Sequence, residues 1–99
     1  MIHRITVTDQ TTPEDMDNFF SHAWRSENRV RLTFDVRHCR NISLKRAARM
    51  KSVLEKHRAR SLKYIEESEI LVPHRGAKMI IQAALVLFKA ATPVRVTVG

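Results

Sequence analysis

Residues 34–50 read FDVRHCRNISLKRAARM, and they pass from the pattern of a β-strand to that of an α-helix across a polar, basic corner. Before the corner, the segment RVRLTFDVR (29–37) alternates apolar and polar side chains, which is typical of a strand with one buried face. The alternation places Val30, Leu32, Phe34 and Val36 inward and Arg31, Thr33, Asp35 and Arg37 outward. After the corner, Ser43 is a suitable N-cap, and we expect a helix from there to about Arg58.

The same strand-to-helix alternation continues on both sides of this stretch. Toward the N-terminus, IHRITVT (2–8) alternates, and a helix follows with Thr12 as its N-cap and Pro13 in its first turn. Toward the C-terminus, the pattern predicts a short strand EILV (69–72), a helix over 73–90 and a last strand PVRVTV (93–98). We therefore expect one α/β domain over 1–99, of order βαβαβαβ, with three helices on a four-stranded, mixed or mostly parallel sheet.

The alternation also predicts what each face of the sheet carries. Strands covered on both faces are usually apolar throughout, whereas three of these four strands alternate, so we expect the helices to crowd one face. The other face then carries Arg4, Arg31 and Arg95 together with several threonines, and Asp35 as its one acid. Arginines on neighbouring strands repel one another. We therefore expect this face to bind an acidic or phosphate-bearing partner, or a second copy of the chain.

The two later helices differ in their polar residues. In the helix after Ser43, the pattern predicts a buried seam of Ala47, Met50, Leu54 and His57, with Lys45, Arg49 and Lys56 on the far side. In the helix over 73–90, the polar residues form a narrow wet stripe on an otherwise buried rod: Arg75, Lys78, Gln82 and Lys89.

Positive charge is concentrated in the middle third of the chain. The net charge is +8, and residues 29–64 hold twelve basic and two acidic side chains. Such a surface is either a solvated helix face or the contact surface for an anionic partner. The segment KHRARSLKY (56–64) is the best candidate for phosphate contact, through Lys56, Arg58, Arg60 and Lys63, with Lys45 and Arg49 on the preceding turns.

Cysteine content and hydropathy restrict the cellular setting. Cys39 is the only cysteine, which favours a reducing, intracellular and cytoplasmic compartment. Met1 leads directly into a strand pattern without a signal peptide. The longest apolar run, 79–88, is interrupted by Gln82 and is too short to span a bilayer.

Catalytic and metal chemistry find little support in the residue pattern. His38 and Cys39 at the corner could form a base and a nucleophile, but neighbours in a loop seldom point at one another, and no third group can be assigned to orient them. None of the five histidines forms a His-x-x-x-His pair, and there is no second cysteine for a zinc site. We therefore expect neither an enzyme, nor a metal site, nor a cofactor.

Three segments together resemble the STAS domain, the fold of bacterial anti-sigma-factor antagonists and of sulfate-transporter tails. They are RVRLTFDV with Asp35, the helix NISLKRAARMKSVL, and the last strand TPVRVTV after an apolar helix. The resemblance implies a non-enzymatic module that binds a protein partner. Antagonists of that family carry Asp-Ser-Ser-Gly at the strand-to-helix corner, where one serine is phosphorylated. Here the corner is Ile42-Ser43-Leu44-Lys45, with Ser43 at the aspartate position, so the phosphorylation switch does not carry over.

Two hypotheses for function follow from these patterns. The first is a non-catalytic, STAS-like protein-interaction module that works in a larger assembly. The alternative is a small basic protein that binds nucleic acid without sequence specificity. Binding to arbitrary DNA or RNA that weakens steeply with salt would favour the alternative.

Overall fold

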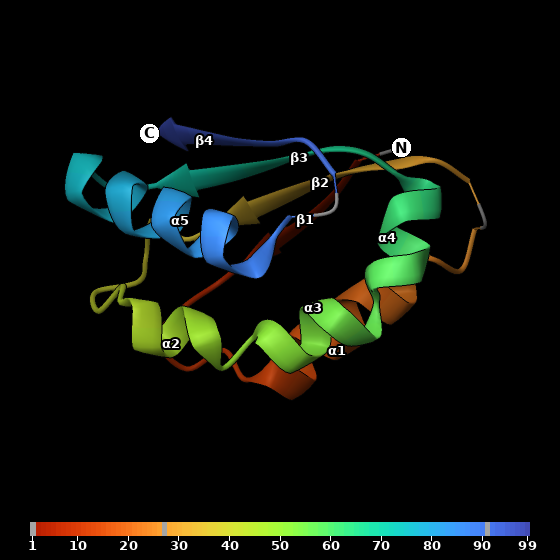
Figure 1. The fold of residues 1–99 in the computed structure, drawn as a ribbon, viewed down its shortest axis with the longest axis horizontal. Coiled ribbons are helices and arrows are strands. Elements are labelled where there is room, and N and C mark those ends of the chain that lie inside the picture. Colours follow the sequence, from red (N-terminus) through yellow and green to blue (C-terminus); the bar gives the residue numbers. More distant parts are fainter. Residues whose placement is uncertain (1, 27, 91) are drawn as a thin grey trace.

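Four parallel strands form the sheet, as shown by a computed structural model that describes residues 2–26, 28–90 and 92–99 (Figure 1). The elements in chain order are β1 (Ile2–Thr6), α1 (Pro13–Ala23), β2 (Val30–Asp35), α2 (Leu44–Ala48), α3 (Lys51–Lys56), α4 (Arg58–Tyr64), β3 (Ile65–Val72), α5 (Arg75–Phe88) and β4 (Val94–Val98). The expected α/β class is confirmed. The sheet is parallel throughout its described strands, whereas the sequence left room for a mixed one.

The spatial order of the strands, β1-β2-β3-β4, follows the chain. Each crossover therefore joins direct neighbours, and right-handed crossovers of this kind place every helix on the same side of the sheet. Figure 1 shows all the labelled helices on one side. The arginines of the opposite face are accordingly exposed, with 52% of the Arg4 side chain and 68% of the Arg95 side chain open to solvent.

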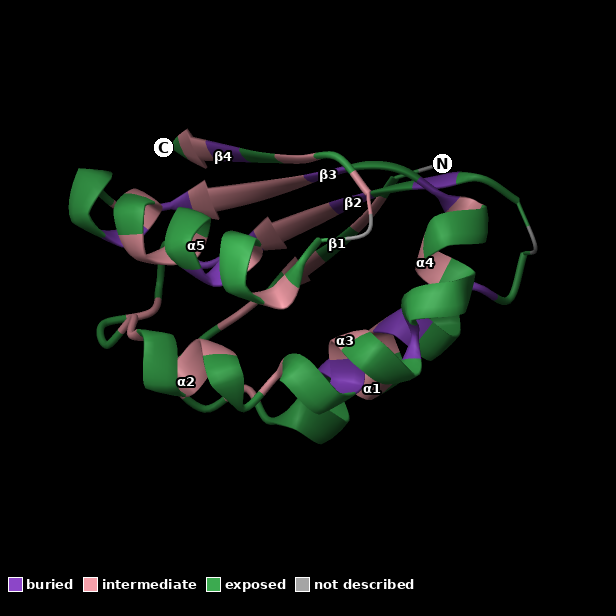
Figure 2. Ribbon diagram, in the orientation of Figure 1, coloured by how far each residue is buried: buried purple, intermediate pink, exposed green. Residues whose placement is uncertain are grey.

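The second crossover differs from the single long helix that the sequence predicts. It consists of three short helices, α2, α3 and α4, which are separated at Met50 and His57. The backbone of His57 leaves helical geometry, with φ −97° and ψ 7°. Its side chain is held by Asp17 of α1 and by Trp24, the C-cap of α1. Tertiary contacts therefore override the helical periodicity here. Figure 2 shows that α2 and α4 contain no buried residue, so these two segments pack only loosely onto the sheet.

A polar network lies inside the core beneath α1. Nε1–H of Trp24 donates to Nδ1 of His57 over 3.0 Å, and Nε2 of His57 lies 2.6 Å from Oδ1 of Asp17. Because Nδ1 accepts, the imidazole carries its hydrogen on Nε2 and donates it to Asp17. His57 is only 3% exposed, so both ring nitrogens have their partners where water is excluded. The network ties α1 to the end of α3.

β3 and α5 also differ from the sequence-based expectation. β3 starts at Ile65, four residues before the predicted EILV strand, which brings Glu66 and Glu67 into the sheet. α5 buries only Ala77 and Ala84, and it exposes large apolar side chains on its outer face. Met79 is 72% exposed and Val86 is 78% exposed, so the prediction of a buried rod with a narrow wet stripe is wrong.

Candidate functional site

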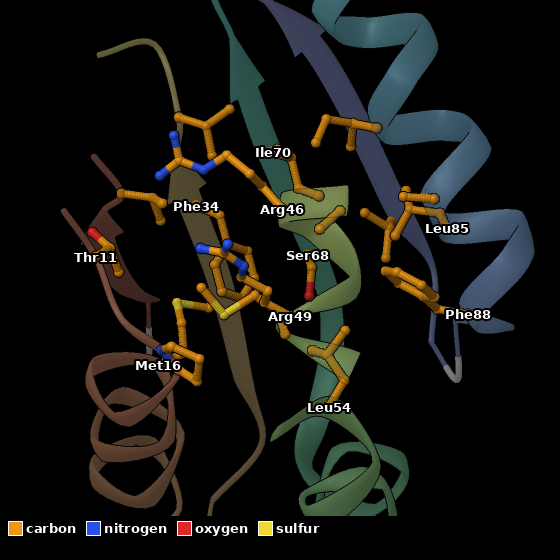
Figure 3. A pocket seen from close by; sticks show the side chains of 18 of the residues that line it. Thr11, Met16, Phe34, Arg46, Arg49, Leu54, Ser68, Ile70, Leu85 and Phe88 are labelled. Carbon is orange, nitrogen blue, oxygen red and sulfur yellow. The ribbon is translucent and has the colours of Figure 1, made fainter. Parts of the chain in front are cut away.

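An apolar cleft of about 450 Å³ lies between the sheet and the helices. Figure 3 shows its floor on the inner face of the sheet, where Phe34 of β2 and Ser68 and Ile70 of β3 point into it. Leu85 and Phe88 of α5 form one wall. The opposite wall comes from the second crossover, which contributes apolar side chains there: Ala47, Met50 and Leu54.

The cleft exists because the core is divided. One cluster of buried residues joins α1 and α3 to the first two strands around Phe20, Trp24 and Leu32. A second, smaller cluster joins α5 to the other end of the sheet around Val72 and Val96. The loosely packed second crossover does not fill the space between the two clusters. Two inward-facing apolar side chains of the central strands, Phe34 and Ile70, are therefore only half-buried, whereas their neighbour Leu32 is buried.

Among the described residues, Ser68 is the one polar side chain of the strands that form the floor of the cleft. The residue is 6% exposed, and its backbone N–H donates to the carbonyl of Pro93 over 3.0 Å. Its hydroxyl forms no hydrogen bond with any residue in the described ranges. The hydroxyl is not among the fully buried polar atoms that lack a partner, so it is accessible from the cleft. A polar atom of a bound group can pair with it there. Sequence reasoning missed Ser68 because the strand was expected to start after it.

Arginines lie along the edge of the cleft. The guanidinium of Arg46 donates two hydrogen bonds to Asp9, one to its carboxylate over 3.0 Å and one to its backbone carbonyl over 2.6 Å. The pKa of Asp9 lies below its usual value, because the backbone N–H of Arg40 donates to the carboxylate and the guanidinium of Arg46 lies beside it. Arg49 and Arg58 also line the cleft, are exposed, and form no ion pair with the residues that the structure describes. The mouth of the cleft is therefore positively charged.

The predicted sheet-face arginines are exposed but not without partners. Arg31 lies 3.4 Å from a carboxylate oxygen of Glu66, and Arg95 lies 2.8 Å from Glu69. The expectation that Asp35 is the only acid on this face is wrong, because β3 presents Glu69 there, which lay in the predicted strand, and its longer N-terminal part adds Glu67 beside β2. Opposite charges on neighbouring strands thus compensate one another within the sheet.

Asp35 is the most strongly held carboxylate of the sheet face. It is 2% exposed and lies under Arg4 and Arg37, which donate to it over 2.6 Å and 2.8–2.9 Å. These hydrogen bonds, those of Arg37 foremost, hold the pKa of Asp35 far below its usual range. Asp35 is therefore ionised at all ordinary pH values and serves as a structural anchor between β1 and the end of β2.

The remaining predicted residues lie along the second crossover. Ser43 is the N-cap of α2, and its hydroxyl accepts from the N–H of Arg46 over 3.2 Å. Lys56 pairs with Asp17 over 2.8 Å, and Nζ of Lys63 lies 5.2 Å from the centre of the Tyr64 ring. Five of the predicted basic residues are exposed and form no ion pair within the described part of the chain: Lys45, Arg49, Arg58, Arg60 and Lys63.

The cysteine and the histidines are distributed over separate places. Cys39 is half-buried, its Sγ donates to the carbonyl of Val7 over 3.2 Å, and burial raises the pKa of the thiol. His38 is exposed, and His74 caps α5 by accepting from the N–H of Ala77. Within the described ranges, no three His, Cys, Asp or Glu side chains come close enough together to hold a metal ion.

Comparisons of the chain with family models, with curated proteins and with solved structures found no match. Among the described helices, none is both long and apolar enough to cross a membrane.

Proposed function

We propose that this protein is a non-catalytic interaction module that holds an amphipathic segment of a partner protein in its apolar cleft. The observation that carries the proposal is the cleft itself, about 450 Å³ of space lined by apolar side chains from β2, β3, α3 and α5. A module of this kind is what the resemblance to STAS domains implies.

The cleft has the properties that recognition of an amphipathic segment requires. Its half-buried apolar side chains would lose their remaining contact with water when apolar side chains of a partner enter, which contributes about 25 cal/mol per Å². The partner's apolar anchors would occupy the floor near Phe34 and Ile70. Acidic residues beside those anchors would meet Arg49 and Arg58 at the mouth.

The alternative of nucleophilic chemistry at the cleft has less support. Cys39 lines the cleft, but its thiol donates to a carbonyl and its pKa is raised by burial. A thiol of raised pKa is a poor nucleophile, because the thiolate is the reactive form. The sheet face also gives less support for binding, since its arginines already face carboxylates of the same sheet.

Filling the cleft tests the proposal. In Ser68→Leu, a larger apolar side chain occupies the floor and replaces the hydroxyl, so stability should rise by about 1–2 kcal/mol. Binding of the partner should be lost although the fold is more stable. Thr33→Val is the control for loss of the hydroxyl, because it replaces a hydroxyl by a methyl group in the same sheet on the opposite face.

The experiment is affinity capture with the wild-type protein and both variants, followed by titration of each captured protein. The proposal requires a protein that binds the wild type and Thr33→Val directly and does not bind Ser68→Leu. Equal binding to all three would contradict it. Native mass spectrometry that finds a small apolar molecule in the wild type, absent from Ser68→Leu, would replace the protein partner with a small ligand.

Binding of nucleic acid is the second candidate, and one observation favours it. Arg58, Arg60 and Lys63 of α4 are exposed, form no ion pair within the described residues and lie beside Tyr64. Cations with an aromatic ring can hold a phosphate backbone and stack a base.

A further inference from the structure

We propose that the free edge of β4 binds an extended acidic segment of a protein, which adds to the sheet as a fifth strand. This surface lies outside the cleft, and the inference does not depend on what the cleft binds. It explains three residues of the polar stripe of α5, Arg75, Lys78 and Gln82, which line neither the cleft nor the sheet face, whereas Lys89 lines the cleft.

β4 lies at the edge of the sheet, where one side of its backbone has no neighbouring strand in the described part of the chain (Figure 1). Toward β3, the carbonyl of Pro93 accepts from Ser68, and the N–H of Gly99 donates to Val72, each over 3.0 Å. Backbone groups alternate in direction along a strand, so the odd-numbered residues bond to β3. The N–H and C=O groups of Val94, Val96 and Val98 therefore point outward from the sheet, where another strand can pair with them.

A hollow of about 660 Å³ lies directly beside this edge. Arg95, Val96, Thr97 and Val98 of β4 form one side of it. α5 forms the other side with three of the four polar-stripe residues, Arg75, Lys78 and Gln82, and with Met79. An extended segment paired with β4 would thus lie between the edge and α5.

The charge of the hollow identifies the chemistry of its occupant. Its charged lining residues are all basic: Arg75, Lys78 and Arg95. Arg75 and Lys78 form no ion pair with any described residue. Both lie in the first turns of α5, where the helix dipole disfavours cations and no acidic residue offsets them. An acidic segment would remove this unfavourable arrangement.

Apolar contacts complete the site. Met79 is 72% exposed and Val98 is 43% exposed, and both line the hollow. Side chains of an added strand alternate in direction, so one set faces α5, where acidic residues meet Arg75 and Lys78 beside Met79, and the other set lies beside Arg95 and Thr97 on the open face of the sheet. A second copy of this chain fits poorly, because pairing two β4 edges would bring the same cations together.

A synthetic peptide of alternating Glu and Val, labelled for fluorescence anisotropy, is the probe, and a peptide of alternating Lys and Val is its control. We expect the acidic peptide to bind and the basic peptide not to bind. On binding, hydrogen exchange at the amides of Val94, Val96 and Val98 should slow, while Arg95 and Thr97 are already protected by β3.

Two sets of variants separate edge pairing from general attraction of charge. Val98→Pro removes an outward N–H without removing a hydrogen bond to β3, and it should weaken binding at least about tenfold, whereas Val98→Ala should not. Arg75→Glu with Lys78→Glu should abolish binding while stabilising α5, because acids suit a helix N-terminus. Arg60→Glu with Lys63→Glu makes the same change of net charge on α4 and should retain binding.

Unchanged affinity in Val98→Pro, equal losses in the two double variants, or binding without protection at alternate β4 amides would each overturn the proposal. The cleft variant Ser68→Leu should bind this peptide normally, so failure of the edge site and failure of the proposed function are distinguishable.

Discussion

Ser43 closes the corner between β2 and α2 with a single side-chain hydrogen bond to the N–H of Arg46. Ser43 therefore has a structural role as the N-cap of α2. α2 is only five residues long and buries none of them, so its first turn depends strongly on this cap.

We predict that Ser43→Ala lowers the free energy of unfolding by about 0.5–2 kcal/mol, the usual range for loss of an N-cap. Ser43→Asp should retain stability, because aspartate caps equally well and suits the helix dipole. Urea unfolding followed by the fluorescence of Trp24, the only tryptophan, measures both. If Ser43→Asp kept its stability but lost partner binding, a charge at this corner would be regulatory after all.

At the scale of the element, the sheet face owes its charge balance to β3. The glutamates of β3 lie between arginines of β2 and β4, so the face is a ladder of alternating charge across strands. A change on one strand therefore acts on its neighbour.

We predict that Arg31→Glu with Arg95→Glu lowers stability although both side chains are exposed. The change places glutamates beside Glu66, Glu67 and Glu69, and like charges on neighbouring strands cost about 0.2–1 kcal/mol per pair. The melting temperature should fall at low salt and partly recover at high salt, because salt screens exposed charges. Arg31→Gln with Arg95→Gln is the control and should lose less. Equal losses in both variants, independent of salt, would rule out repulsion as the cause.

α4 allows a separate test of nucleic-acid binding. Reversal of charge at Arg58, Arg60 and Lys63 should weaken binding to all sequences alike, because phosphate contacts carry no sequence information. For the wild type, the logarithm of the binding constant should fall with the logarithm of salt at about −0.9 per phosphate neutralised on duplex DNA. Reversal at Arg25, Arg75 and Lys78 makes an equal change of net charge elsewhere and should matter less. No measurable binding at low salt would remove this candidate.

At the scale of the whole molecule, three aspartates connect segments that are distant in the chain. Asp9 joins the loop after β1 to the loop after β2, Asp17 joins α1 to α3, and Asp35 joins β1 to β2. Hydrogen bonds from arginine, lysine, histidine and backbone N–H groups lower the pKa of each carboxyl in the folded protein.

We predict that the protein loses stability in acid through these carboxyls. A carboxyl with a lowered pKa in the folded state binds protons first in the unfolded state, so its contribution is complete above the usual aspartate pKa and is lost as the pH falls below it. The urea midpoint should thus be nearly constant from about pH 7 to about pH 5 and fall steadily below about pH 4.

Asp35→Asn gives the control for this acid sensitivity. The variant should be less stable than the wild type near neutral pH, and the difference should shrink as the pH falls and wild-type Asp35 loses its advantage. A wild-type midpoint that does not change between about pH 6 and about pH 3 would show that these ion pairs contribute nothing to stability.

Features set by neighbouring residues could be predicted from the sequence. Interactions within a few residues determine the cap at Thr12 and the place of Pro13 at the start of α1. The two-residue period of a strand likewise determines the alternation along β2, and packing agrees with both. The order of strands and helices, and hence the α/β class, follows from the same periods. The polar stripe of α5 could also be found in this way, but the stripe alone did not show what it faces.

Only the tertiary structure decided the features that depend on pairing between distant residues. His57 interrupts the second crossover while it is held by Trp24 and Asp17, more than thirty positions away, and helical periodicity contains no trace of that contact. The register that sets Glu69 beside Arg95 and the gap that opens over Ser68 likewise arise when separate segments meet. Local periodicity determines which face of an element is apolar, but the packing of whole elements determines whether that face is covered, and here it leaves a cleft open.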